Sequence, residues 1–329
     1  MLTNRLLPSP LFVPTWARWL IYAVVAAFAV YKLSPALHAG DRLNGFDISG
    51  ALVPKSQIAR GGPPRDGIPA LSRPAMLPAS NVDYLKPADR VLALNVGGDA
   101  RAYPIRILNW HEVVNDTVGG RGVVISYCPL CGTGMVFDAQ PGDRPLDFGV
   151  SGLLYNSDML LYDRQTSSLW SQIRAQAISG PMKGSALSLI AADFTSWQAW
   201  KQQHPEGLVL DKNTGHSRDY SRDPYAGYEN VATLYFDVQN RDERFHEKEP
   251  VVGLTVEGKA KVWPLSELAK VGQWPLQDSL GGTDLRINYR AHDKSVTIVD
   301  AKGIQLPAIP AYWFAWIAFY PDTQVFLFE

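Results

Sequence analysis

Cys128 and Cys131 are the only cysteines in the chain, and they lie in one turn, YCPLCG (127–132). Thiols at this spacing can bind one metal ion or form a small redox-active disulfide. The Cys-Pro-Leu-Cys-Gly sequence is typical of a metal-binding knuckle, because the turn directs both sulfurs inward and glycine allows close backbone approach. The leading prediction is therefore a metal site that contains both thiolates.

Further ligands are expected from His, Met and Asp side chains of the same half of the chain. His111 is the first candidate for a third ligand, and Met135, Asp158, Met159 and His204 could complete the coordination. Thiolate with thioether favours Cu(I), whereas thiolate with imidazole suits zinc or copper, so the predicted metal is copper or zinc. The wall of the site is expected to include Met135, Tyr155, Asp158, Met159, Asp163, Arg164, Trp170 and His204.

Two other functions remain open for the same turn. In a thiol–disulfide redox protein, Cys128 would attack and Cys131 would resolve the mixed disulfide. In a non-catalytic accessory subunit of a membrane complex, the cysteines would only fix the turn. Gly132 follows the second cysteine, where attachment of c-type haem needs histidine, and no nucleotide-binding glycine loop occurs, so neither cofactor is expected. Whether the protein is an enzyme stays open, and no catalytic residue is assigned.

A degenerate duplication helps to separate scaffold from chemistry. Residues 91–104 (VLALNVGGDARAYP) resemble 251–264 (VVGLTVEGKAKVWP), and residues 115–139 resemble 277–301. The second copy lacks the three predicted metal ligands: Arg290, Asp293 and Gln273 occupy the positions of Cys128, Cys131 and His111. We infer that the first copy holds the chemistry and that the second is a structural partner.

The composition limits the class of protein. The chain has 329 residues, of which 46% are hydrophobic, so it can bury a sizeable core. The net charge of −1 and a pI of about 6.6 suggest no basic face, so nucleic acid is not an expected partner.

The N-terminus predicts a membrane anchor. Residues 19–31 are apolar without a break and are bounded by Arg18 and Lys32. A helix of this length is shorter than the hydrocarbon core, but flanking Arg, Lys, Trp and Tyr side chains suit the membrane interfaces. We expect a single-pass signal anchor that contacts the lipid bilayer through residues 19–33, with the main body periplasmic; a cleaved signal peptide is the alternative.

The remaining pattern predicts a β-rich α+β fold. Short β-runs separated by glycine pairs indicate hairpins at 91–103 and 113–127, and helices are expected near 104–112, 195–203, 264–271 and 311–319. The expected fold consists of two pseudo-repeats of short antiparallel strands with a few helices, plus the transmembrane helix. The expected segments are the anchor (1–37), a Pro/Gly-rich arm (38–90), repeat 1 (91–210) with an insert (142–185), a Tyr-rich loop (211–250) and repeat 2 (251–329).

Several of these motifs occur together in one known family. GGPPRDGIP (61–69), YCPLC (127–131), YDR (162–164), SLW (168–170) and HP (204–205) together resemble the domain of unknown function 3179 family over roughly residues 55–327. The resemblance implies an exported or membrane-anchored protein. It implies no activity, so the function has to come from the residues themselves.

Overall fold

The structure is a computed structural model that describes residues 41–142 and 144–329. The chain divides into two compact units, Met1–Arg42 and Leu43–Glu329. Only Asp41 and Arg42 of the first unit lie among the described residues.

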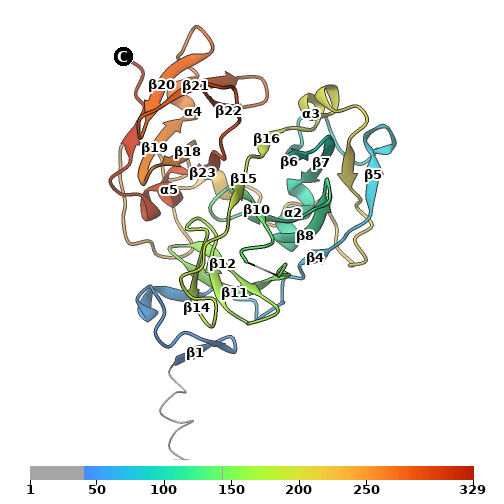
Figure 1. Ribbon diagram of the computed structural model, residues 1–329, viewed down its shortest axis with the longest axis vertical. Coiled ribbons are helices and arrows are strands. Elements are labelled where there is room, and N and C mark those ends of the chain that lie inside the picture. Colours follow the sequence, from blue (N-terminus) through green and yellow to red (C-terminus); the bar gives the residue numbers. More distant parts are fainter. Residues whose placement is uncertain (1–40, 143) are drawn as a thin grey trace, which may run out of the picture. The chain divides into compact units, whose positions relative to one another are not determined.

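Five sheets form the body of the second unit in a five-blade β-propeller arrangement (Figure 1). Blade 1 has the strand order β16 (Asp193–Ser196), β6 (Arg90–Val96), β7 (Asp99–Pro104), β17 (Leu208–Leu210) and β5 (Met76–Pro78). Blade 2 has the order β15 (Leu189–Ile190), β10 (Thr133–Asp138), β9 (Arg121–Cys128), β8 (Val113–Val118) and β4 (Leu71–Ser72). Blade 3 has the order β14 (Gln176–Ser179), β13 (Leu169–Ser171), β12 (Asp158–Asp163), β11 (Phe148–Tyr155) and β3 (Ile58–Arg60).

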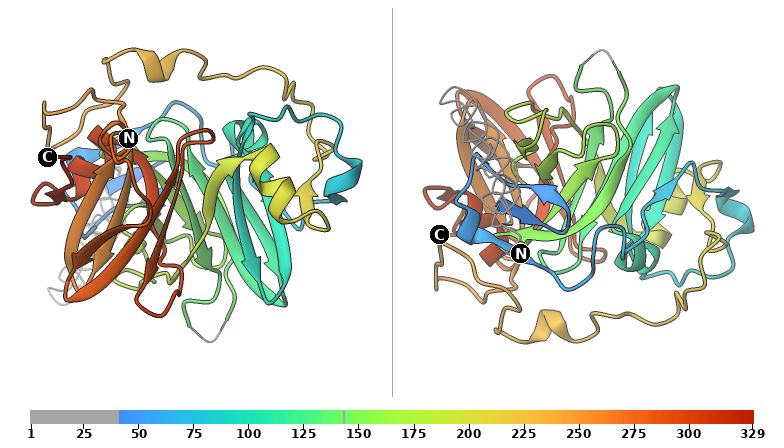
Figure 2. Two further views of the ribbon diagram at one scale, coloured as in Figure 1. Left: turned by 90° about the horizontal axis from the view of Figure 1, so that it is seen from above. Right: turned by 90° about the horizontal axis from the view of Figure 1, so that it is seen from below.

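The last two blades come from the C-terminal part of the chain. Blade 4 has the order β23 (Ile309–Tyr312), β18 (Pro250–Val256), β19 (Lys259–Pro264) and β24 (Gln324–Val325). Blade 5 has the order β20 (Leu276–Leu280), β21 (Thr283–Arg290) and β22 (Ser295–Asp300). A small two-stranded sheet of β1 (Arg42–Leu43) and β2 (Phe46–Asp47) precedes the blades. Near the centre, β10 packs against β23 and β16 packs against β22 (Figures 1 and 2).

Helices are few and short in the described part of the chain. They are α2 (Ile105–His111), α3 (Trp197–Gln203), α4 (Leu265–Leu268) and α5 (Trp313–Phe319), with 3₁₀ turns η2 (Lys55–Gln57), η3 (Ala79–Asn81) and η4 (Tyr228–Asn230). Each α-helix directly follows a strand, and Ser196 caps α3 by accepting a hydrogen bond from the Ala199 amide. The four helices expected from the sequence are confirmed.

Glycine pairs close the two hairpins that the sequence predicted. The turn Gly97-Gly98 joins β6 to β7, and Gly119-Gly120 joins β8 to β9; all four residues have positive φ. Such two-residue turns match the right-handed twist of the strands. Gly119 is also required for space, because a Cβ there would lie 2.2 Å from the Val96 carbonyl oxygen.

The expected α+β architecture of two pseudo-repeats is wrong, because five sheets share one propeller-like arrangement. The arm and the insert account for the difference. Residues 142–185 supply most of blade 3, and the arm adds edge strands β3, β4 and β5 to blades 3, 2 and 1. These pairings join segments that are distant in the sequence, so local periodicity does not reveal them.

The expected transmembrane anchor is also not supported. None of the helices in residues 41–142 and 144–329 is long and apolar enough to cross a bilayer. The segment on which that prediction rested, residues 19–33, lies outside the described residues. The transmembrane helix, the signal anchor and the single-pass periplasmic location are therefore not retained.

Asn115 joins blade 2 to blade 3. It lies on β8 and is 5% exposed. Its side-chain oxygen accepts a hydrogen bond from the Phe148 amide at 2.7 Å, and its Nδ2 donates to the Phe148 carbonyl at 2.8 Å and to the Leu71 carbonyl at 3.3 Å. One side chain thus replaces a pair of strand hydrogen bonds across the junction between the two blades.

We expect Asn115→Ala to lower the free energy of unfolding by about 2–4 kcal/mol, because it leaves the Phe148 amide and carbonyl buried without partners. Urea unfolding measures the effect. The matched control is Asn288→Ala, at an exposed position of β21, which should change stability by less than about 0.5 kcal/mol. Equal losses in the two variants would contradict the role of Asn115.

Candidate metal centre

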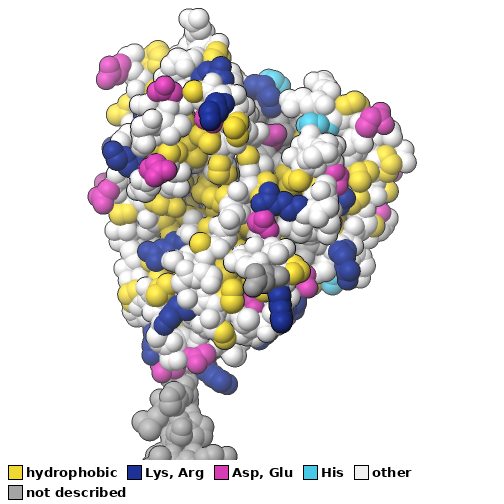
Figure 3. All heavy atoms as spheres, in the orientation of Figure 1, with side chains coloured by type: hydrophobic (Ala, Val, Ile, Leu, Met, Phe, Trp, Pro, Cys, Tyr) yellow, Lys and Arg dark blue, Asp and Glu magenta, His cyan; other side chains and the backbone are white. Residues whose placement is uncertain are grey.

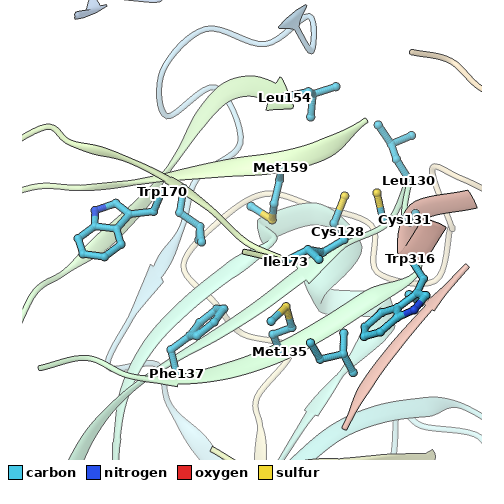
Figure 4. Packing of buried hydrophobic residues seen from close by; sticks show 14 of the residues in the cluster. Cys128, Leu130, Cys131, Met135, Phe137, Leu154, Met159, Trp170, Ile173 and Trp316 are labelled. Carbon is cyan, nitrogen blue, oxygen red and sulfur yellow. The ribbon is translucent and has the colours of Figure 1, made fainter. Parts of the chain in front are cut away.

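The turn between β9 and β10 places the two thiols together. Cys128 ends β9, and the Cys131 amide donates to the Cys128 carbonyl at 3.2 Å, which closes the turn. Gly132 has φ of +60° and lies against the ring of Tyr312, so a side chain there would be strained and crowded. Figure 4 shows the two sulfurs side by side on the same side of the turn.

Asp158 reaches the thiols from blade 3. It begins β12, directly after a turn in which Asn156 and Ser157 both have positive φ. One ligand atom each from Cys128, Cys131 and Asp158 lie within 4.8 Å of one another. All three side chains are at most 1% exposed. The structure therefore brings together two soft sulfur donors and one carboxylate oxygen, a set compatible with metal binding.

The three side chains are held by the surrounding backbone. Cys131 Sγ lies 3.4 Å from the Ser157 carbonyl oxygen, and one carboxylate oxygen of Asp158 accepts a hydrogen bond from the Ile173 amide at 3.1 Å. The other oxygen, Oδ1, is buried and has no hydrogen-bond partner among the described residues. Because an unpartnered buried oxygen is costly, this atom is available for a further ligand.

Burial favours the protonated forms of Asp158 and Cys131. It raises the pKa of the Asp158 carboxyl to about 8, although the Ile173 and Met159 amides and the two neighbouring thiols act in the opposite direction. Burial also raises the pKa of the Cys131 thiol well above its usual value, with further contributions from Cys128 and Asp158. In the described part of the chain, Asp158 forms no ion pair with Lys or Arg, so nothing there compensates the charged forms.

Glu112 is a fourth acidic group near the site. It is 7% exposed, and burial, followed by the charge of Asp158, raises the pKa of its carboxyl to about 8. Glu112 ends α2 with φ of +59°, an uncommon conformation for this residue type. The sequence analysis missed Glu112, because the left-handed backbone that directs it is not visible in the sequence.

A tyrosine from the long loop covers the thiols. Tyr228 packs in the same hydrophobic cluster as Cys128 and Cys131, and its hydroxyl is buried without a hydrogen-bond partner in the described part of the chain. Burial raises the pKa of this phenol, and both thiols add to the effect. The Tyr-rich composition of the loop was visible in the sequence, but its position over the site was not.

His111 does not join the group of Cys128, Cys131 and Asp158. Its Nδ1 lies 2.7 Å from the Pro69 carbonyl oxygen, and its Nε2 lies 2.6 Å from the Tyr220 hydroxyl. Burial lowers the pKa of this imidazole to about 4, so the neutral ring is favoured. With Nδ1–H donating to Pro69 and Nε2 accepting from Tyr220, both nitrogens are occupied.

Comparison with family models identifies the family of this chain. A family model described as protein of unknown function (DUF3179) matches residues 65–323. The chain belongs to the DUF3179 family. No curated protein and no solved structure matches the chain. The resemblance noted in the sequence is therefore confirmed, and the DUF3179 name assigns no activity.

In this DUF3179 protein, the other residues expected in the site wall fall into two groups. Met135, Met159 and Trp170 pack with the thiols in one hydrophobic cluster (Figure 4). The remaining four make other contacts: Tyr155 packs in a different cluster, Asp163 accepts a hydrogen bond from the Trp170 indole, Arg164 pairs with Asp66, and the His204 ring lies tilted against Trp200. The expected wall is thus partly assembled around the sulfurs.

We expect the metal-free DUF3179 protein to lose stability relative to Glu112→Gln as pH rises from about 5 to about 8. The carboxyl of Glu112 has a usual pKa of 4.5, so the unfolded chain releases this proton first while the folded chain keeps it up to about pH 8. The difference in free energy of unfolding, measured with urea and a chelator under reducing conditions, should reach at least about 2 kcal/mol.

Glu257→Gln, at an exposed turn, serves as the control and should show a flat difference across the same pH range. A difference for Glu112→Gln that stays flat, or a wild type that gains stability relative to this variant as pH rises, would contradict a raised pKa at Glu112.

Proposed function

We propose that the protein binds a zinc ion through the thiolates of Cys128 and Cys131 and the carboxylate of Asp158. The observation that carries the proposal is the meeting of these three buried groups, whose ligand atoms lie within 4.8 Å of one another. Zinc–sulfur distances of about 2.3 Å and zinc–oxygen distances of about 2.0–2.2 Å require donor atoms that are close to each other, so only a small contraction is needed.

The charges of the three ligand groups favour a bound metal ion over a turn with a purely structural role. Two thiolates and one carboxylate are all acidic, and among the described residues no Lys or Arg pairs with Asp158. Without a cation, each group has to keep its proton in the dry interior. A divalent ion can replace those protons and use the otherwise unpartnered Asp158 Oδ1.

The donor set favours zinc over copper. A thioether would favour Cu(I), but Met159 Sδ already accepts a hydrogen bond from the Ser126 hydroxyl at 3.5 Å. The Ser126 hydroxyl in turn accepts from Gln172 Nε2 at 2.8 Å, which fixes it. Two thiolates with a hard carboxylate oxygen match the borderline character of Zn²⁺ better than that of Cu(I).

Three protein ligands leave one tetrahedral position for water or a substrate, which is the pattern of catalytic zinc sites. Glu112 and the Tyr228 hydroxyl lie near the thiols and could contact a group bound there. We therefore propose that the site supports a zinc-dependent enzymatic activity. The reaction itself is not assigned.

A thiol–disulfide redox function is the second candidate. It is favoured by one observation, that both cysteines are free and lie close to a buried carboxyl that could accept a proton. Accessibility weighs against it, because a thiolate that attacks a protein disulfide has to be exposed, and Cys128 and Cys131 are at most 1% exposed.

We expect protein purified under reducing conditions to bind about one equivalent of zinc per chain, measured by elemental analysis. Cys128→Ser and Cys131→Ser should abolish stoichiometric binding, because each removes a ligand. Asp158→Asn should weaken the affinity at least about 100-fold, more than the loss of a residue that only supports a ligand.

His111→Gln and His204→Gln are the controls, because the structure places neither side chain in the three-residue group; both variants should retain zinc. Unchanged zinc content in Cys128→Ser would contradict the proposal. A wild-type protein that binds no zinc but readily forms a Cys128–Cys131 disulfide would favour the redox function instead.

A further inference from the structure

A cavity of about 410 Å³ lies at the centre of the described part of the chain, separate from the proposed zinc ligands. Strands β16, β22 and β23 contribute to its wall, together with residues that flank the thiol turn. Figure 3 shows hydrophobic side chains in a hollow at the centre of this face, in the region where these three strands meet in Figure 1. The volume falls in the range of pockets that hold small organic ligands.

The wall of this central cavity is aromatic on one side. Tyr127 and Phe194 stack with ring centroids 6.3 Å apart, and Tyr312 also lines the cavity. Most of the remaining lining residues are aliphatic or proline. An apolar, preferably planar, body of a ligand would therefore be bound by burial and by stacking.

The charged groups of the cavity are predominantly positive. Arg90, Lys248 and Lys294 line it, whereas Glu229 is the one acidic residue among its described lining residues. Lys248 is 2% exposed, and its ammonium donates to the carbonyls of Val231 and Thr233. Among the described residues, no carboxylate lies at salt-bridge distance from this ammonium, so its positive charge can attract an anion.

Arg90 is the best placed of these cations. Its guanidinium lies over the Phe194 ring, 4.3 Å from the centroid, and donates to the carbonyls of Asp293 and Phe194. The charge of the Asp293 carboxylate acts on this guanidinium, but no carboxylate of the described residues lies at salt-bridge distance from it. Two of its five N–H groups are used by these carbonyls, so three remain for a ligand. Planar guanidinium groups bind carboxylates through two parallel hydrogen bonds.

We propose that the central cavity binds a small aromatic carboxylate, with the carboxylate on Arg90 and the ring against the aromatic wall formed by Phe194, Tyr127 and Tyr312. Inorganic phosphate fits less well, because the wall is mainly apolar. The cavity touches the thiol turn through Tyr127 and Gly132, and the Tyr312 amide donates to the Cys131 carbonyl at 2.8 Å. The proposal goes beyond the zinc site and does not depend on it.

Isothermal titration of the wild-type protein with 3-phenylpropanoate and with indole-3-acetate tests the proposal, with the corresponding amides and inorganic phosphate as comparisons. At least one of the two acids should bind with a 1:1 stoichiometry and at least about tenfold more tightly than its amide and than phosphate. If neither acid binds, or if an amide or phosphate binds equally well, the proposal is wrong.

Two variants address the location of the ligand. Arg90→Gln should weaken the acid at least about tenfold and leave the amide unchanged. Arg90 also donates hydrogen bonds to two backbone carbonyls, so a second variant is needed that keeps those bonds. Ala308→Phe fills the cavity and should abolish binding of the acid. Arg60→Gln, which removes an exposed arginine, should have no effect.

The zinc site is tested separately in the same experiment. Cys128→Ser should bind the aromatic acid as tightly as the wild type. Loss of binding in Cys128→Ser together with normal binding in Arg90→Gln and Ala308→Phe would overturn the assignment of the ligand to the central cavity.

Discussion

The burial of three acidic ligand groups in one small volume is the constraint on which this account depends. Cys128 and Cys131 belong to a hydrophobic cluster, and the buried Asp158 meets them there; among the described residues, Asp158 forms no ion pair with Lys or Arg. A charged group in such surroundings has to be neutralised by a proton or by an opposite charge. The metal-free protein uses protons, and a zinc ion would replace them. Metal binding and proton release should therefore be coupled in this protein.

The same constraint links the site to the architecture. The two thiols come from a turn of blade 2, whereas Asp158 comes from a turn of blade 3. Asn115 holds these two blades together through Phe148. A metal bound by both blades would add a second connection across the junction, so occupancy of the site should stabilise the contact between the blades.

Local structure could be predicted from the sequence where one residue type dictates the backbone. The Gly97-Gly98 and Gly119-Gly120 turns identified their hairpins, and the four short helices lie where they were expected. The turn at Asn156-Ser157 was not predicted, because it lacks the glycine that usually marks positive φ. The propeller arrangement was also missed, since edge strands such as β3 and β15 pair with partners distant in the sequence.

Only part of the candidate site could be predicted from the sequence. The spacing of Cys128 and Cys131 identified the thiols, and Asp158 was among the donors expected from the insert. Nothing in the sequence distinguished Asp158 from the other expected donors, because its selection depends on the packing of two blades. His111 was preferred as the third ligand because the second copy lacks it, but the Pro69 carbonyl and the Tyr220 hydroxyl occupy its nitrogens. Tertiary hydrogen bonds of this kind have no local signature.

X-ray absorption at the zinc edge of the zinc-loaded protein shows directly which atoms surround the metal. We expect two sulfur atoms at about 2.3 Å from the zinc ion and oxygen atoms at about 2.0–2.2 Å from it. Any Cys131→Ser protein that still retains zinc should show one sulfur atom fewer. A zinc ion surrounded only by nitrogen and oxygen, or by a single sulfur in the wild type, would contradict the proposed metal site.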